Sequence, residues 1–218
     1  MQLSERKYKL QTMELLALQS QMNPHFLFNT LQTIYWKVCS FTGKSNEVNR
    51  MIENLSDILR YSLETGEMNV TLEEEIKNTI SYIEIQKIRY KDKFDVIWEY
   101  DDDIKQLKVV KLLLQPLVEN SIYHGIKEKE GKSYIKIKIN HSNHWIKIVV
   151  IDNGLGITPE KLIKLQEKLN QDQDYSEHIG LFNTNKRLML TYYGNQFRIK
   201  IRSKMGWGTA VYIYIPIL

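Results

Sequence analysis

At 218 residues, the chain is long enough to bury one or two hydrophobic cores, and 43% hydrophobic with 26% charged residues is the composition of a soluble globular protein rather than a disordered one. The net charge of +4 is mild, and basic residues are scattered among acidic ones, so a nucleic-acid partner is not expected. The single cysteine, Cys39, excludes an internal disulfide framework and suits a reducing compartment such as the cytosol.

The N-terminal segment predicts one long amphipathic helix over residues 3–41. Pro24 lacks the backbone N–H of a helix interior and its ring crowds the preceding turn, so we expect a bend just before His25. Such a bend would expose the imidazole to a partner, although a lone histidine on a kinked helix is more commonly an ordinary polar residue. The helical pattern consists of apolar residues at three- and four-residue spacing: Leu15, Leu18, Met22, Leu27, Leu31, Ile34 and Val38.

A second helix is predicted to begin near Asn46 and to form a helical hairpin with the first. Because two helices alone bury too little apolar surface, we expect two chains to associate as a homodimeric four-helix bundle, with His25 outside it near the midpoint. The polar, glycine-containing residues 64–69 predict a hinge between a hairpin domain, residues 1–66, and a second domain, residues 67–218. The expected apolar stripe of the second helix is Val48, Met51, Ile52, Leu55, Ile58, Leu59 and Ser62.

The second domain is predicted to be an α/β sandwich, with helices on one face of a mixed sheet, which makes the overall fold class α+β. Thr71 and Glu74 form a capping-box pattern at the start of a helix that should bury Leu72, Ile76, Ile80 and Ile83. Residues 158–178 suggest a mobile segment over a site, with a helical start at Pro159. The expected strands are residues 94–100, 134–139, 145–151, 197–202 and 209–215, and the other expected helices are residues 112–126 and 180–193.

Two polar motifs in the second domain suggest ligand chemistry. Within residues 115–125, Asn120 and His124 lie one helical turn apart on the same face, and the amide oxygen of a buried asparagine suits magnesium. Asp152 ends a strand directly before Gly154 and Gly156. The glycines let the backbone approach a ligand closely, and the carboxylate can accept a hydrogen bond from an exocyclic amine.

Two glycine motifs follow. Gly180 opens a helix whose free backbone amides can face a phosphate. Residues 206–209, with the sequence GWGT, form a tight turn into the final strand. Alone, the motif at residues 115–125 is about as common in plain caps as in ligand sites, and the motifs at residues 152–156 and 206–209 are more common in plain turns. The conjunction of the four motifs in this order is far more specific.

Residues 23–31, NPHFLFNTL, resemble the phosphoacceptor segment of the LytS/YehU-type (YesM-like) sensor histidine kinases, in which the histidine after Asn-Pro takes the phosphoryl group. Residues 59–61, LRY, and 85–90, IQKIRY, also match this pattern. The four later motifs resemble the N, G1, G2 and glycine-threonine boxes of the Bergerat-type ATP-binding domain shared by gyrase, MutL and histidine kinases. The resemblance covers nearly the whole chain.

This resemblance implies a two-component sensor histidine kinase that uses ATP to phosphorylate His25 and passes the phosphoryl group to an aspartate of a response regulator receiver domain. It implies that Asn120 holds Mg²⁺ against the ATP phosphates, and that Asp152 recognises the adenine amine with support from Thr209. It also implies the cytoplasmic part of a membrane receptor, with membrane segments upstream of this chain. The other implied nucleotide-binding residues are Tyr123, His124, Gly154, Gly156, Gly180, Leu181, Asn183, Lys186 and Arg187.

The sequence departs from the resembled pattern in two places. Many histidine kinases carry an acidic residue directly after the phosphohistidine, but this chain has Phe26 there, which leaves Glu119 as a candidate base. The second glycine box has Gly180 alone where two or three glycines are usual, so the conformation of the lid over the site stays open.

Two alternative functions belong to other classes. An ATP-gated signalling or interaction module would bind nucleotide and transfer nothing, which Phe26 would explain. An ATPase clamp like gyrase or MutL should have a glutamate one turn before Asn120, where this chain has Pro116. His141, His144 and His178 show no ligand-like spacing, so no transition-metal site is predicted.

Overall fold

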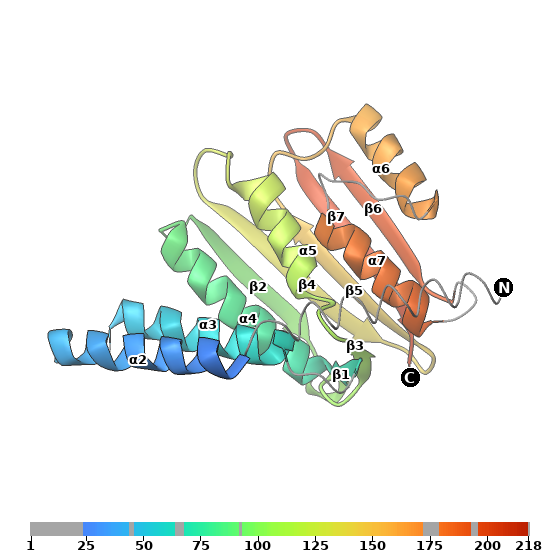
Figure 1. The fold of residues 1–218 in the computed structure, drawn as a ribbon. Coiled ribbons are helices and arrows are strands. Elements are labelled where there is room, and N and C mark those ends of the chain that lie inside the picture. The colour runs from blue at the N-terminus through green and yellow to red at the C-terminus, as the bar shows by residue number, and fades with distance from the viewer. Residues whose placement is uncertain are drawn as a thin grey trace. The chain divides into compact units, whose positions relative to one another are not determined.

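The computed structural model of this chain describes residues 24–43, 46–63, 68–91, 93–171, 179–192 and 196–217. The chain divides into two units, Met1–Thr65 and Gly66–Leu218. The first contains a pair of helices and the second a sheet covered by helices (Figure 1), which confirms the predicted α+β class. Over the described residues, none of the helices has the length and apolar character of a bilayer span.

The first unit is a hairpin of α2 (Pro24–Thr42) and α3 (Glu47–Leu63). Asn46 caps α3, because its side-chain oxygen accepts the backbone N–H of Val48 at 2.9 Å and that of Asn49 at 3.2 Å. The buried Asn49 then donates to the carbonyl of Tyr35 at 3.3 Å and to Cys39 Sγ at 3.1 Å. The two helices are therefore held together by a polar residue of α3 as well as by apolar contact.

The apolar surface of the hairpin is only partly used within one chain. From the predicted stripe of α3, Ile52 is buried, whereas Val48 and Leu55 are exposed. On α2, Trp36 is 62% exposed and Phe41 is 86% exposed. The expected bend before His25, and everything N-terminal to Pro24, lie outside the described residues.

The second unit is built on one five-stranded sheet. Its strands are, in spatial order, β2 (Phe94–Tyr100), β4 (Ser133–His141), β5 (Trp145–Asp152), β7 (Gly208–Pro216) and β6 (Arg198–Lys204). β2 and β4 run parallel and all other neighbours are antiparallel, so the sheet is mixed, and all five predicted strands are present.

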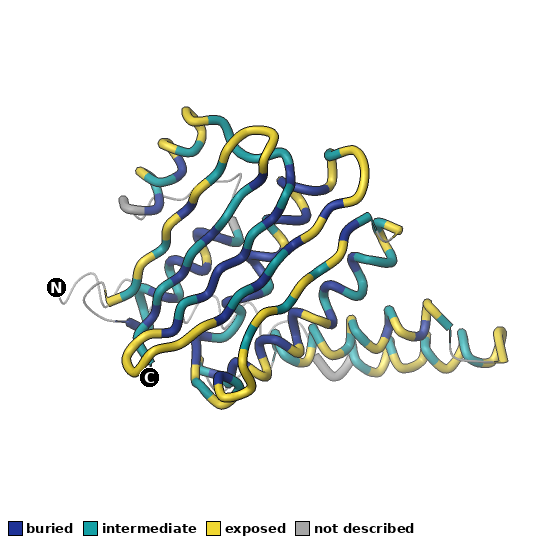
Figure 2. The backbone as a smooth tube through the Cα atoms, turned by 180° about the vertical axis from the view of Figure 1, so that it is seen from behind, coloured by how far each residue is buried: buried dark blue, intermediate teal, exposed yellow. Residues whose placement is uncertain are grey.

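Helices cover one face of this sheet. α4 (Leu72–Arg89), α5 (Gln115–Asn120) and α7 (Ile179–Thr191) lie across it, and α6 (Pro159–Gln171) lies at its β6 end (Figure 1). Alternate residues of each strand point toward the helices, as Ile135, Ile137 and Ile139 of β4 do, and these are fully buried. The opposite face carries the exposed and half-buried residues between them (Figure 2).

The start of α4 forms as the sequence predicts, but its buried face differs. The Thr71 hydroxyl accepts the N–H of Glu74 at 3.2 Å, and the Glu74 carboxylate accepts the N–H of Thr71 at 2.7 Å. The prediction that Ile80 is buried is wrong, because its side chain is 41% exposed. Buried polar side chains instead complete the inner face of α4: Glu75, Asn78, Thr79, Ser81 and Gln86.

The helix predicted over residues 112–126 is shorter and less regular than expected. It begins at Gln115, because Leu112 has a φ of +59°, which no right-handed helix allows. Its second half, η2 (Ser121–Ile126), is a π-helix. A short ribbon of β1 (Asn69–Thr71) and β3 (Lys108–Val110) was not predicted, because three residues carry too little periodicity. The turn η1 (Asp102–Ile104) follows β2.

We expect Thr71→Ala to lower the free energy of unfolding by about 1 kcal/mol, because it leaves the N–H of Glu74, in the first turn of α4, without its acceptor. Thr158→Ala is the matched control, since the Thr158 hydroxyl accepts the N–H of Lys161 at a distance of 3.5 Å, too long to stabilise much. Urea denaturation of both variants measures the difference, and equal losses would contradict the capping interpretation.

Candidate functional site

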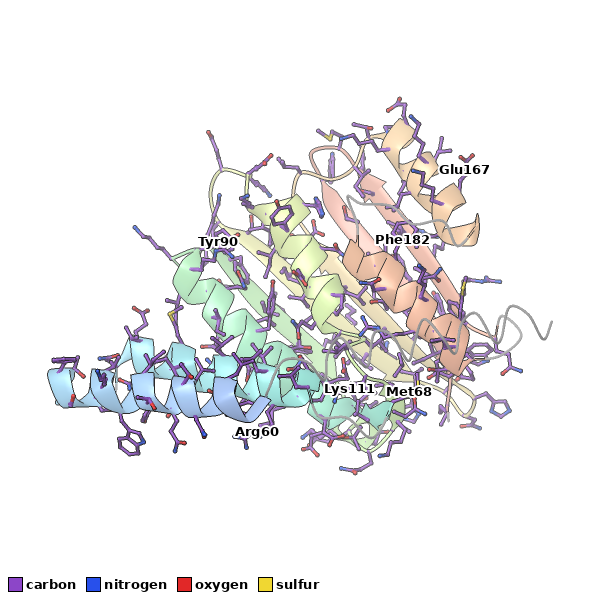
Figure 3. All side chains as sticks on the ribbon, viewed as in Figure 1. Arg60, Met68, Tyr90, Lys111, Glu167 and Phe182 are labelled. Carbon is purple, nitrogen blue, oxygen red and sulfur yellow. The ribbon has the colours of Figure 1, made fainter. Side chains whose placement is uncertain are left out.

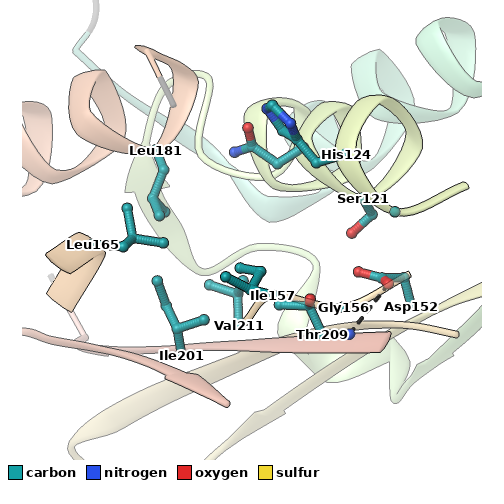
Figure 4. Close-up of a pocket in the computed structure, with 12 residues that line it drawn as sticks. Ser121, His124, Asp152, Gly156, Ile157, Leu165, Leu181, Ile201, Thr209 and Val211 are labelled. Carbon is teal, nitrogen blue, oxygen red and sulfur yellow. Dashed lines mark hydrogen bonds between the residues drawn. The ribbon is translucent and has the colours of Figure 1, made fainter. Parts of the chain in front are cut away.

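A pocket with a free volume of about 60 Å³ lies between the helix layer and the sheet (Figure 4). It has room for several water molecules. One wall comes from α5 and η2, the floor from β5 and β7, and the far side from α6, α7 and β6. It is lined by Asn120, Ser121, His124, Gly125, Asp152, Gly156, Ile157, Leu165, Leu181, Ile201, Thr209 and Val211.

The pocket unites residues from all four sequence motifs. Those predicted from the sequence that line it are Asn120, His124, Asp152, Gly156, Leu181 and Thr209. Those that do not line it are Glu119, Tyr123, Gly154, Gly180, Asn183, Lys186 and Arg187. His25 belongs to the other unit, and its side chain lies outside the described residues.

Asp152 is the buried charge of the pocket. Its Oδ1 accepts the backbone N–H of Gly154 at 2.9 Å and that of Thr209 at 3.2 Å. Burial raises the pKa of this carboxyl above its ordinary value, and those two amides, the Ser121 hydroxyl and Lys129 oppose the rise. The carboxylate is therefore held in a fixed orientation. The donors around it offset only part of the free-energy cost of removing it from water.

Thr209 is fixed in turn by the β6–β7 hairpin. Its hydroxyl shares a hydrogen bond of 2.8 Å with that of Ser203, and Ser203 Oγ also lies 2.9 Å from the carbonyl of Gly208 and accepts the N–H of Ile157 at 2.8 Å. The turn after β5, the end of β6 and the start of β7 thus meet at one small polar cluster beside Asp152.

Close packing of backbones explains the glycines around Asp152. A Cβ on Gly154 would overlap the backbone of Gly125, and a Cβ on Gly125 would lie 2.9 Å from Asp152 Oδ1. Gly156 has a φ of +75° and packs on the carbonyl of Lys204. Gly154 therefore lets the turn after β5 approach η2 closely. Gly156 lies in the same turn and borders the pocket.

The π-helical turn presents the polar wall of the pocket. The N–H of Lys127 donates to the carbonyl of Ile122 at 2.9 Å, five residues earlier, which widens the helix around Gly125. Asn120, Ser121 and His124 face the pocket from this segment. The expected alignment of Asn120 with His124 is thus present, on a helix of a different type.

The neighbouring predicted residues of this segment face elsewhere. Tyr123 is 57% exposed, and Lys127 Nζ lies 4.7 Å from the centre of its ring. Glu119 is also exposed toward solvent, and partial desolvation raises its pKa. Neither side chain borders the pocket.

On α7, only the first turn reaches the site. Gly180 lets α7 approach α5, since a Cβ there would lie 3.3 Å from Pro116 Cβ and 3.8 Å from Asn120 Nδ2. Asn183 is exposed, and Arg187 donates to the carbonyl of Lys111 at 3.5 Å, away from the pocket.

Sequence reasoning missed two classes of lining residue. Ser121 and Gly125 stood within a recognised motif. Ser121 lies three residues before His124 and four before Gly125, a spacing that would have placed these residues on one helical face. The apolar residues Ile157, Leu165, Ile201 and Val211 have no such signal, because an inward-facing residue of a strand or helix looks the same whether it meets core or ligand. Over the described part of the chain, no group of three or more His, Cys, Asp and Glu side chains could hold a metal ion.

Family comparisons agree with this geometry. The model of the histidine kinase family matches residues 13–94, and that of the histidine kinase-, DNA gyrase B- and HSP90-like ATPases matches residues 107–218. The chain belongs to the histidine kinase family. The first match covers the helical hairpin and α4, and the second covers most of the sheet and the pocket, so both units take part in the similarity.

This histidine kinase is 33% identical over 209 residues to sensor protein kinase HptS of Staphylococcus aureus, in strains USA300 and NCTC 8325 alike. The match covers 96% of this chain and 39% of HptS, so the chain spans well under half the length of these relatives. Its fold is similar to that of the histidine kinase domain of the blue-light activated histidine kinase EL346 from Erythrobacter litoralis. That similarity covers 93% of this kinase and 90% of the other chain, with a TM-score of 0.51 and 15% identity.

We expect Gly154→Ala to lower the free energy of unfolding of this kinase by about 3 kcal/mol, because the added methyl group must displace the Gly125 backbone. Gly206→Ala is the matched control: its φ is +79°, but nothing lies within 4 Å of the added carbon, so only about 1 kcal/mol of backbone strain is expected. Chemical denaturation decides between them, and a Gly154→Ala loss no larger than that of Gly206→Ala would count against the packing explanation.

Proposed function

We propose that this chain is the kinase portion of a two-component sensor histidine kinase, which uses ATP to phosphorylate His25 and then transfers the phosphoryl group to an aspartate of a response regulator. The observation that carries the proposal is the pocket in which Asn120, His124, Asp152 and Thr209 converge from separate motifs. The family membership and the similarity to HptS support it.

ATP is the substrate that this pocket suits. The fixed carboxylate of Asp152 would accept a hydrogen bond from the exocyclic amine of adenine, since its orientation is set by Gly154 and Thr209. Apolar side chains on the α6, α7 and β6 side, such as Leu165, Leu181 and Ile201, would pack against the base (Figure 4). The phosphates would extend toward Asn120 and the first turn of α7 at Gly180.

Mg²⁺ is the proposed cofactor. The side chain of Asn120 offers a neutral oxygen ligand at this wall, and the described residues contain no group of three or more His, Cys, Asp and Glu side chains that could hold the ion without a substrate. That donor set fits an ion that keeps several waters and is held mainly by substrate phosphates. When bound, Mg²⁺ would neutralise phosphate charge, while Asn120 orients the complex.

Transfer requires an in-line approach of the His25 imidazole to the γ-phosphorus, and the protein contributes position and charge rather than covalent help. A neutral imidazole is available near pH 7. Because His25 and the pocket belong to different units, the proposed hinge at residues 64–69 lets a domain of residues 67–218 bring its nucleotide to a domain of residues 1–66. Glu119, one residue before Asn120 and with a raised pKa, is the proposed acceptor of the imidazole proton.

Two further proposals concern assembly. The exposed Trp36, Phe41, Val48 and Leu55 of the hairpin support a homodimer in which they are buried in a four-helix bundle. The other proposal is a cytoplasmic position within a membrane receptor whose membrane segments precede this chain, with a response regulator receiver domain as the second partner. The similarity to HptS, a sensor protein kinase of which this chain covers 39%, supports a signalling role within a longer protein.

Phe26 favours one alternative, an ATP-gated signalling module with little or no kinase activity, because no acid follows the proposed phosphoacceptor. Tight ATP binding without phosphorylation would distinguish it from the kinase.

Asp152→Asn should weaken ATP binding by about 10- to 100-fold, because the amide presents a donor where adenine needs a charged acceptor. It should also stabilise the free protein at neutral pH. The raised pKa of Asp152 means that its ionised form costs folding free energy above the folded-state pKa, and this cost disappears below the unfolded value of about 3.9. The stability difference from wild type should therefore grow as pH rises above about 4.

Calorimetric ATP titrations and thermal melts across pH test both effects. Asp95→Asn is the control of opposite sign, because Lys132 lowers the pKa of Asp95 and the variant should lose rather than gain stability at neutral pH. Unchanged ATP affinity in Asp152→Asn would reject the adenine assignment.

Incubation with γ-labelled ATP and Mg²⁺ should give acid-labile, alkali-stable phosphate on the wild-type chain, and His25→Gln should abolish it. His144→Gln, an exposed histidine in the β4–β5 turn, should retain the label. Label that survives in His25→Gln would move the phosphoacceptor elsewhere, and ATP binding without label in the wild type would favour the gated module.

A further inference from the structure

A carboxylate on α4 holds the loop that leads into α5. Glu75 is 0% exposed, and its Oε1 accepts the N–H of Leu112 at 2.5 Å, while its Oε2 accepts those of Leu113 and Leu114 at 2.8 and 2.9 Å. Consecutive amides that converge on one carboxylate form a strong, charge-assisted anchor. α5 has no side-chain cap of its own at Leu114, so Glu75 supplies from another helix what a cap would give.

The anchored loop is held in a conformation that its sequence disfavours. Leu112 has a φ of +59°, in the left-handed region that costs a residue with a Cβ about 1–2 kcal/mol. Its own N–H makes the shortest of the three bonds to Glu75. The carboxylate therefore offsets the strain that turns the chain from β3 into α5.

Two more contacts fasten the same junction. One turn after Glu75, Asn78 Nδ2 donates to the side chain of Gln115, the first residue of α5, at 2.8 Å. The N–H of Lys111 donates to the carbonyl of Met68 at 2.9 Å, and Figure 3 shows both residues at the β1–β3 end of the unit. The start of α5 is thus positioned by α4 and by the segment that enters the domain.

What begins at this junction is the polar wall of the pocket. Asn120 follows Leu114 by six residues, a rise of about 9 Å along a helix, and Ser121, His124 and Gly125 follow directly. A helix of this length transmits a rotation or shift at its start to its end, because its backbone hydrogen bonds keep it stiff. Displacement of residues 112–114 would therefore displace Asn120.

We propose that Glu75 is a positioning residue for the nucleotide site: by binding the amides of residues 112–114 it sets the register of α5 and so the place of Asn120 in the pocket. This deepens the proposed ATP-dependent function and rests on it. The competing interpretation is that Glu75 caps a loop locally, with no effect at the pocket.

The test compares Glu75→Gln with Glu73→Gln. Glutamine has the length of glutamate but only one acceptor oxygen. Its NH2 group would face backbone N–H groups of residues 112–114, which are also donors, so part of the anchor is lost. Glu73 lies in the same helical turn and is exposed, so it controls for the lost charge. Amide hydrogen exchange at residues 112–114 and 120–125, and calorimetric titration with ATP and Mg²⁺, are measured where both variants are folded.

We expect Glu75→Gln to speed exchange at residues 112–114 and also through 120–125, and to weaken ATP binding by about tenfold. Glu73→Gln should stay within about twofold of wild type. Leu112→Gly should restore much of the loss when combined with Glu75→Gln, because glycine adopts a positive φ without an anchor. If Glu75→Gln alone fails to fold, the double variant is compared with Leu112→Gly alone, and slower exchange at residues 120–125 in Leu112→Gly is the expected result.

Faster exchange confined to residues 112–114, or wild-type ATP affinity in Glu75→Gln, would overturn the proposal. The exchange experiment needs no nucleotide. A wild-type chain that fails to bind ATP would therefore contradict the proposed function, while exchange at residues 120–125 would still decide whether Glu75 positions the helix.

Discussion

The whole pocket depends on the close contact between two backbones, at Gly125 on the π-helical turn and at Gly154 after β5. A side chain on Gly154 would overlap the Gly125 backbone, so the absence of one lets the helix layer touch the end of the central strand β5. The carbonyl of Gly125 accepts the N–H of Leu155 at 2.9 Å, which locks the contact. Asp152 lies next to this contact, since a Cβ on Gly125 would lie 2.9 Å from its Oδ1, and the N–H of Gly154 helps to set its orientation.

A second convergence fixes the other side of Asp152. Gly208, at a φ of +111°, packs on the carbonyl of Asp152, and the N–H of Gly206 donates to the carbonyl of Leu155 at 2.7 Å. The helix end, the β5 turn and the β6–β7 hairpin therefore meet where glycines remove side-chain volume. Motifs spread over more than half of the second unit become one site because backbones, rather than long side chains, bring them together.

Much of this fold was predictable from local patterns. Period-two alternation located the strands, and the capping box located α4, because these signals depend on nearby residues alone. The burial of Glu75 in place of Ile80 was not predictable, since the partners of Glu75 are backbone amides on a loop far along the chain. The positive φ of Leu112 was not predictable for the same reason. The sequence around Leu112 favours a helix, and a tertiary contact overrides that preference.

The site shows the same limit. The motifs pointed to Asp152, Asn120 and Thr209, whose chemistry is visible in their residue types. On α7 the inward face is set by Leu181, Thr184 and Leu188, all buried at three- and four-residue spacing. Asn183 and Arg187 fall on another face and do not line the pocket, so their role beside the phosphates stays a prediction.

The electrostatics of Asp152 bear on the proposed binding of ATP. A buried carboxylate loses hydration, and the donors around it recover only part of that loss, since its pKa remains raised. A ligand that brings one more N–H donor and an apolar plane supplies the missing hydrogen bond and excludes the remaining water. In the proposed function, part of the binding free energy would then come from relief of a cost already present in the free protein.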